Sequence, residues 1–237
     1  MSGTLRTPEE ARDFVRARGV AVRTPDPWLP SIFAAAGGAP ARPGKGGFGS
    51  WPAHAWWWGG VMHADGDILP VKVLKGRTAY VAKGVWPALD AAVRGRGAAL
   101  AGTARALVDA LAARGPTRSD DLRRATGLGA PARAAAFKKA RAAVEGLGLV
   151  ITLPAESEKH EHVALLELWE TRFPRPLGKE RGVDAFVRAA IGAAGAVPEK
   201  VVRGWFGWPR EEVVEAVERL VTGGKVVRGK GGVLSVQ

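Results

Sequence analysis

The 237-residue sequence contains no cysteine, and its only glutamine is the terminal Gln237. The lack of cysteine excludes disulfides, zinc fingers and catalysis by a thiol. No stretch approaches the roughly 18 consecutive apolar residues of a membrane-spanning helix. The first residues, MSGTLRTPEEARDF, lack the hydrophobic region of a secretion signal. We therefore expect a soluble, cytoplasmic protein without a membrane partner.

Several motifs of cofactor and catalytic sites are also missing. The sequence has no phosphate-binding loop, no Rossmann fingerprint and no Gly-x-Ser-x-Gly turn. His160 and His162, in EKHEHV, have the spacing of a metal-binding pair, but no third matching ligand accompanies them. Alternate polar residues are also ordinary on an exposed strand. We predict neither a metal nor a cofactor.

Positive charge is the main compositional feature. The formal net charge is +12 and the isoelectric point is near 10.7. Arg outnumbers Lys 24 to 11, which also fits a lineage rich in Ala, Arg, Gly and Pro. The charge is concentrated, however, since residues 94–141 hold eleven Arg or Lys against three Asp. Such a local excess favours a polyanionic partner, and we expect double-stranded DNA.

The last 140 residues contain a repeat. ARALVDALAARGPTRSDDLRRATGL predicts two helices, ARAAAFKKARAAVEGLG predicts a third, and a strand follows Gly148. The C-terminal stretch repeats this plan, with Gly195 and Gly207 spaced as Gly115 and Gly127 are, and ends in the alternating KVVRGKGGVLSV. Three helices closed by a hairpin describe a winged helix, a variant of the helix-turn-helix.

The N-terminal third predicts a looser version of the same plan. TPEEARDFVRARG is a helix capped by Thr7, LPSIFAAAGG is a second helix, and APARPGKGGFGS is a mobile loop. ILPVKVLKGRTAYVAK then predicts a hairpin. The fold class is α+β, mostly helical, with tandem winged-helix units at residues 1–97, 98–153 and 154–237.

Exposed cations mark the predicted DNA surface. In the helix after Pro131, Phe137, Ala140, Val144 and Leu147 form the core stripe, which leaves Lys138 and Lys139 outside. The equivalent helix of the third unit exposes Glu211, Glu212, Glu215 and Glu218, a face that repels phosphates, so this unit is either a scaffold or binds DNA through its wing. The predicted DNA-binding residues are Lys72, Lys75, Arg77, Arg123, Arg124, Arg133, Lys138, Lys139, Arg141, Lys225, Arg228 and Lys230.

The N-terminal pattern, followed along the chain by tandem winged helices, resembles the AlkZ (YcaQ) group of DNA glycosylases, and especially its short AlkZ-related members. The resemblance is carried by TPEEARDFVRARGVAV, LPSIFAAAG and ILPVKVLKGRTAYVAKGVWPALDA, with the two later repeats. It implies a DNA-binding fold that excises damaged or modified bases. AlkZ-type enzymes rely on a Gln-x-Gln or Gln-x-Asp motif, which this sequence lacks, so no catalytic residue is carried over.

The segment HAWWWGGVMHADGD supplies candidates for such chemistry. On a helix, Trp56, Trp57 and Trp58 point about 100° apart, so at least one leaves the core and can stack on an extruded base. A carboxylate can stabilise an oxocarbenium-like state or activate water, and an acid can assist the departing base. We therefore nominate Asp65, Asp67, His63 and Asp90, with His54 as a further candidate. Asp65-Gly66-Asp67 is alternatively only a turn, and the tryptophans only an aromatic anchor.

The sequence therefore predicts a monomeric, monofunctional DNA glycosylase that flips out and excises a modified, bulky base, in repair or in defence against foreign DNA. The alternative is a non-catalytic winged-helix DNA-binding protein such as a transcriptional regulator. A regulator should carry a dimerisation element or a ligand domain, and neither is recognisable. A protein-interaction scaffold would suit the acidic third unit but not the basic second one.

Overall fold

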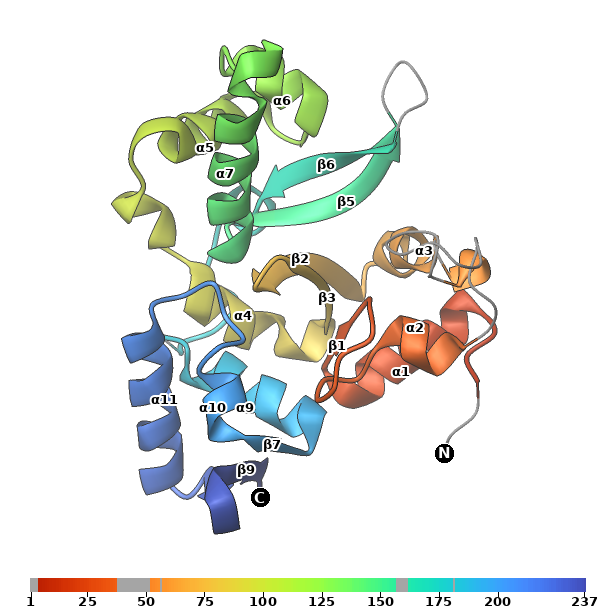
Figure 1. Cartoon of the computed structure of the whole chain (residues 1–237), viewed down its shortest axis with the longest axis vertical. Coiled ribbons are helices and arrows are strands. Elements are labelled where there is room, and N and C mark those ends of the chain that lie inside the picture. Colours follow the sequence, from red (N-terminus) through yellow and green to blue (C-terminus); the bar gives the residue numbers. More distant parts are fainter. Residues whose placement is uncertain (1–3, 38–51, 56, 157–161, 181) are drawn as a thin grey trace.

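The computed structural model describes residues 4–37, 52–55, 57–156, 162–180 and 182–237, and the fold is α+β and mostly helical (Figure 1). Three consecutive units share one order of elements: helix, short strand, helix, helix, strand, strand. The strands of these residues form three antiparallel sheets, in each of which the last strand of the unit lies between the other two. The repeat predicted from the sequence is therefore present three times.

The helices of each unit follow the predicted pattern, including the cap at Thr7, whose side chain accepts from the Glu10 amide. The elements of the first unit are α1 (Pro8–Arg18), β1 (Val20–Val22), α2 (Ile32–Ala36), η2 (Ala53–Ala55), α3 (Trp58–Ala64), β2 (Ile68–Leu74) and β3 (Arg77–Ala82). The predicted mobile loop, APARPGKGGFGS, lies outside the described residues. A connector follows, with η3 (Lys83–Val85), α4 (Trp86–Val93) and η4 (Arg96–Ala99).

The second and third units are more regular than the first. The second consists of α5 (Gly102–Arg114), β4 (Thr117–Arg118), α6 (Ser119–Ala125), η5 (Pro131–Arg133), α7 (Ala134–Gly146), β5 (Val150–Glu156) and β6 (His162–Leu168). After α8 (Trp169–Arg172), the third consists of α9 (Asp184–Ala194), β7 (Ala196–Pro198), α10 (Glu199–Val202), α11 (Arg210–Thr222), β8 (Val226–Arg228), η6 (Lys230–Gly232) and β9 (Val233–Val236).

The second unit extends further than the sequence predicted. The boundary expected near residue 154 falls inside β5, which pairs with β6 along its whole length from Val150↔Leu168 to Glu156↔His162. The returning strand β6 also pairs with β4, so it completes the second sheet rather than opening the third unit. The sequence did not reveal this because HVALLEL follows a polar break and lacks the glycine-rich turn of the other hairpins. The boundary expected near residue 97 lies between α4 and α5.

The sheet of the first unit is buried on both faces. Leu69, Val71 and Val73 of β2 pack into a core shared with α4, α9 and α11. Ile68 and Tyr80 pack on the other face, in a smaller core with α1, α2 and α3. Because successive side chains of a strand point to opposite faces, Lys72 of β2 faces away from the third unit, whereas Leu74, beyond the irregular register, returns to the shared core. The second unit has its own core, to which Phe137, Ala140 and Val144 contribute as predicted.

The three units meet at the segment that connects α10 to α11. The amide of Gly207 donates to the carbonyl of Val73 on β2 over 2.9 Å, and Trp208 Nε1 donates to the carbonyl of Leu147, just after α7, over 3.3 Å. A Cβ at position 207 would lie 2.9 Å from the Cα of Gly146 and would overlap its carbonyl oxygen. The absence of a side chain at Gly207 therefore permits this junction.

We expect Gly207→Ala to destabilise the protein by about 1–3 kcal/mol, because the added methyl group forces the third unit away from α7. Urea unfolding followed by circular dichroism measures the change. Gly84→Ala is the control, since a Cβ there meets no atom within 4 Å. Equal stability of the two variants would show that the junction at Gly207 adapts without cost.

Candidate functional site

A cleft of about 310 Å³ lies between the first and second units. The first unit contributes Trp57, the start of α3, and parts of β2 and β3, while the second contributes α7 and the β5–β6 hairpin. Figure 1 shows this hairpin extending toward α3. The lining residues are Arg23, Trp57, Gly59, Gly60, Pro70, Lys72, Thr78, Tyr80, Ser119, Arg141, Thr152, Leu153, Pro154, Ala155, Val163 and Ala164. Basic and aromatic side chains thus share one concave surface.

The tryptophan run divides between core and cleft. Trp58, the first residue of α3, is 5% exposed and packs in the core with α1 and α2. Trp57 precedes the helix, is 51% exposed and lines the cleft. Trp56 lies outside the described residues. The prediction that one tryptophan leaves the core is therefore confirmed for Trp57.

Tyr80 forms part of the same wall and packs directly on α3. A Cβ at Gly59 would overlap the Tyr80 hydroxyl, so glycine is needed where the ring meets the helix. Burial raises the pKa of Tyr80 to about 12. The phenol is therefore uncharged at neutral pH.

The deepest charged group beside the cleft is Glu145, near the end of α7, which is 6% exposed. Its carboxylate oxygens accept from Lys72 Nζ at 3.0 and 3.1 Å, and Oε1 also accepts from Arg141 Nε at 2.9 Å. The Thr152 hydroxyl lies 3.3 Å from Oε1. One buried carboxylate thus binds three residues that line the cleft: Lys72 of β2, Arg141 of α7 and Thr152 of β5.

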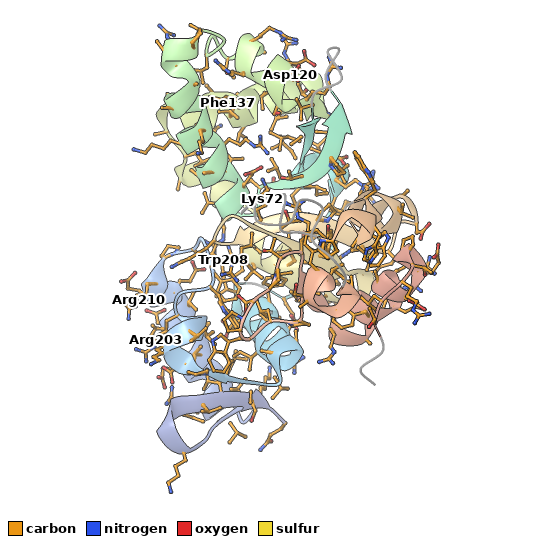
Figure 2. All side chains as sticks on the ribbon, turned by 45° about the vertical axis from the view of Figure 1, so that its right-hand side comes forward. Lys72, Asp120, Phe137, Arg203, Trp208 and Arg210 are labelled. Atoms are coloured by element: carbon orange, nitrogen blue, oxygen red, sulfur yellow. The ribbon has the colours of Figure 1, made fainter. Side chains whose placement is uncertain are left out.

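Strand geometry explains why Lys72 reaches this site. Val71 and Val73 point into the core shared with the third unit, so Lys72, between them, points the other way, toward α7. The register between β2 and β3 is irregular from Val71 to Leu74, a feature that commonly redirects a side chain. Figure 2 shows Lys72 at the junction of the two units.

A basic row connects the cleft to the outer surface of the second unit. Lys138, Arg141 and Glu145 are spaced i, i+3 and i+7 on α7, so they lie along one face of the helix. Lys138 and its neighbour Lys139 are exposed, Arg141 lines the cleft and Glu145 is buried. A polyanion that lies on α7 would therefore meet the cleft at the end of this row.

Asp65 and Asp67 are held by α1 rather than by the cleft. Asp65 accepts from Arg12 over 2.6 Å, and Asp67 pairs with Arg16. Neither aspartate is among the described residues that line the cleft. The turn interpretation fits them better than a catalytic role, because each neutralises an arginine of α1.

His63 is half-buried on α3, and its Nδ1 lies 3.2 Å from the carbonyl oxygen of Ile68. Burial lowers the pKa of the His63 imidazole, which is therefore neutral near pH 7. His54 lies beside Trp58, with ring centroids 5.3 Å apart. Neither histidine lines the cleft within the part of the chain that the structure describes. His162 lies on β6, and His160 lies outside the described residues.

Asp90 is a structural group, 2% exposed and fully engaged. It accepts from Arg94 and from Trp169 Nε1 over 2.6 and 2.7 Å, and from the Leu177 amide over 3.0 Å. Burial alone would raise the pKa of Asp90, but these hydrogen bonds and the Arg94 charge outweigh it and hold the pKa below its ordinary value. Asp90 joins α4 to α8 and to the segment before α9, so its lone pairs are committed to the fold.

The predicted DNA-binding arginines are mostly tied to the protein. Arg77 pairs with Asp26, Arg124 with Asp121, and Arg228 with Glu199 and Glu218. Arg123 and Arg133 donate to backbone carbonyls of the loop between α6 and α7. By contrast, the lysines Lys75, Lys138, Lys139, Lys225 and Lys230 are exposed. Among the acidic residues of α11, Glu212 is also engaged, in an ion pair with Arg96 over 2.5 Å.

No pattern in the sequence indicates that Glu145, Arg23 and Tyr80 belong to one site. One signal was present, since Lys72 is the lone charged residue in the strand ILPVKVL, where a buried charge requires a partner. Its partner lies 73 residues further along the chain and was not identifiable from the sequence. Among the residues that the structure describes, no three His, Asp or Glu side chains are arranged to hold a metal ion. No described helix has the length and hydropathy to cross a membrane.

Comparison of the chain with protein-family models, with curated proteins and with solved structures finds no match. The resemblance to AlkZ-type glycosylases therefore stays a prediction, and function has to be argued from the cleft itself.

We expect Asp90→Asn to lower the free energy of unfolding by about 3–5 kcal/mol at pH 7, because Arg94 loses its buried counter-charge. The folded-state pKa of Asp90 lies below the unfolded value of about 3.9. Its stabilising contribution is thus complete above that value and is lost as the pH falls through the folded pKa. Thermal unfolding at pH 7 and pH 3 should show the gap between wild type and variant narrowing in acid.

Asp109→Asn provides the comparison, since it breaks an exposed pair with Arg105 on α5. It should cost no more than about 1 kcal/mol at either pH. An Asp90 variant as stable as the Asp109 variant would contradict the structural role of Asp90.

Proposed function

We propose that this chain is a double-stranded-DNA-binding protein made of three winged-helix units, and that its inter-unit cleft accepts one extruded nucleotide. In the stronger form of this proposal the protein is a DNA glycosylase that excises the captured base, and it acts as a cytoplasmic monomer. The observation that carries the proposal is the cleft lining, which combines exposed Trp57 with the cations Arg23, Lys72 and Arg141.

The arrangement of the elements supports the winged-helix assignment. In each unit the third helix is followed by a two-stranded hairpin, the order in which a recognition helix precedes its wing. In the second unit, α7 presents Lys138 and Lys139 outward, and small alanines flank them. Lysines next to small side chains allow the helix to approach phosphates closely. The net charge of +12 adds attraction at longer range.

The cleft suits a nucleotide better than a purely apolar molecule. Its volume of about 310 Å³ is at the lower end of the range for small-ligand sites. Trp57 offers a face for stacking, worth about 1–3 kcal/mol for an unpaired base. Arg23 and Arg141 are placed to meet the phosphates that flank such a base.

A carboxylate can assist excision, and Glu145, which bonds to lining residues of the cleft, is our candidate. In a hydrolytic step, water attacks C1′ while the glycosidic bond breaks and the base leaves with the electron pair. Glu145 would accept the proton of that water and stabilise the positive sugar. Asp65 and Asp67 instead pair with arginines of α1, and Asp90 is bound by Arg94 and Trp169. None of the three bonds to a lining residue of the cleft in the described part of the chain, whereas Glu145 bonds to Lys72, Arg141 and Thr152, so we prefer Glu145.

A non-catalytic DNA-binding protein is the second candidate, and one observation favours it. Glu145 is bound by two cations, Lys72 and Arg141, and so reaches the cleft only when one of them moves. In that case the cleft would hold an unpaired nucleotide without cleaving it.

DNA binding should depend on the exposed face of α7. We expect Lys138→Ala with Lys139→Ala to weaken binding to any duplex sequence, because two phosphate contacts are lost. The slope of log affinity against log salt concentration should shrink by roughly 0.9 per contact. Fluorescence anisotropy across a salt series measures both quantities.

The charge-matched control is Lys179→Ala with Lys200→Ala, which removes two exposed cations that are neither on α7 nor among the residues that line the cleft. This double variant should keep the wild-type slope. Equal losses in the two double variants would mean that only the total charge matters and that α7 is not the binding face.

Substitutions of two residues should distinguish capture of the unpaired nucleotide from excision of its base. Trp57→Ala should weaken the preference for duplex with one unpaired base over fully paired duplex by about 1–3 kcal/mol, the value of a stacking contact. Glu145→Gln should keep this preference, because the amide has the same shape. It should slow single-turnover release of a modified base by about 10²-fold or more, as loss of an acid–base group does.

Trp28→Ala is the control for Trp57, since Trp28 is 40% exposed but does not line the cleft. Abasic products are detected by alkaline cleavage of duplexes that carry different bulky modified bases. If the protein captures the unpaired nucleotide but releases a base from none of these duplexes, the non-catalytic alternative is correct. If Trp57→Ala keeps the wild-type preference for duplex with one unpaired base, the unpaired nucleotide does not bind in the cleft.

A further inference from the structure

We propose that Lys72 is an amine nucleophile that forms an imine with the aldehyde of an abasic deoxyribose held in the cleft. This inference rests on the proposed capture of a nucleotide but not on base excision. It assigns the protein a second activity, the covalent retention of abasic sites in DNA. Neither the hydrolytic step nor the phosphate contacts proposed above use this amine.

Lys72 lies partly buried in the wall of the cleft. Its side chain is 19% exposed, and it lines the concave surface of which Trp57 and Tyr80 form another part. The other lysines of the predicted DNA surface, such as Lys138 and Lys139 on α7, lie on exposed faces instead. Lys72 is the one lysine among the described residues that line the cleft. Figure 2 shows it between the first and second units rather than at the outer surface.

The surroundings of Lys72 also supply the proton transfers that imine formation needs. Nζ lies 3.0 and 3.1 Å from the two oxygens of Glu145, within reach for direct transfer. Burial lowers the pKa of Lys72, and the charges of Arg141 and Arg23 act in the same direction, while Glu145 opposes them. The balance favours a larger fraction of neutral amine than an exposed lysine has, as nucleophilic lysines require.

The same cleft can hold the substrate for this step. An abasic sugar lacks a base, so the space beside Trp57 that a base would fill remains open. Its two flanking phosphates are anions, and Arg23 of the first unit and Arg141 of the second both line the cleft. Guanidinium groups bind phosphate oxygens in a bidentate manner, which would position the sugar over Lys72.

The chemistry needs no additional reagent. Lys72 transfers a proton to Glu145, and the neutral amine attacks the C1′ aldehyde of the ring-opened sugar to give a carbinolamine. The carbinolamine oxygen takes up a proton and leaves as water, so a C=N bond replaces the C=O bond. Addition of water reverses the sequence and restores both the aldehyde and the lysine. The complex is therefore covalent but reversible.

The test uses the full chain and a duplex with one pre-formed abasic site, made by removing a uracil. Sodium cyanoborohydride reduces an imine to a stable amine, so wild-type protein should form a complex that survives denaturing electrophoresis. Peptide mass spectrometry should place the adduct on Lys72. Lys72→Arg keeps the positive charge but removes the nucleophile, and it should lose the adduct while still binding the abasic duplex.

Lys83→Arg is the matched control, because Lys83 is exposed in η3 of the same part of the chain and does not line the cleft. It should form the adduct at the wild-type level. The proposal is overturned if wild-type protein binds the abasic duplex without an adduct, or if the adduct maps to another amine. If wild-type protein does not bind the abasic duplex at all, the proposed nucleotide capture is wrong, and so is this inference. Even if Lys72→Arg folds poorly, the residue that carries the adduct in wild-type protein shows whether Lys72 is the nucleophile.

Discussion

The close backbone approach between Gly207 and Gly146 determines how the three units are placed. A side chain at position 207 would overlap the carbonyl of Gly146, whereas the Gly207 amide donates to Val73 of the first unit. One short segment of the third unit therefore contacts β2 and the end of α7 at once. Because Lys72 precedes Val73 and Glu145 precedes Gly146, this junction also sets the distance across which the cleft residues meet.

The Lys72–Glu145 pair gives the cleft its chemical character. Transferring two charges from water into the interior costs several kcal/mol per ion, and their mutual attraction offsets this only with good geometry and further hydrogen bonds. Glu145 has those additional donors in Arg141 and Thr152. A well-packed apolar pair would stabilise the fold at least as well. The charged arrangement is therefore more readily explained by a function in the cleft than by stability.

Arginine and lysine have different roles in this protein. Arg94, Arg203 and Arg228 bind buried carboxylates, where a planar guanidinium donates several hydrogen bonds at once. The lysines of α7 and those at and between the strands β8 and β9 are instead exposed. Burial alone would raise the pKa of Glu199, but its bonds to Arg203 and Arg228 keep it low. Part of the high arginine content thus contributes to the fold, through ion pairs with buried carboxylates.

The sequence by itself determined the local structure: the Thr7 cap, the helix stripe through Phe137 and Val144, the threefold repeat and the departure of one tryptophan from the core. These features depend on neighbours within a turn or two, which spacing reveals. Tertiary structure alone decided that β6 completes the second sheet, that Asp90 accepts a hydrogen bond from Trp169, and that Lys72 meets Glu145. The last two depend on partners more than 70 residues away, and periodicity carries no information about contacts at that separation.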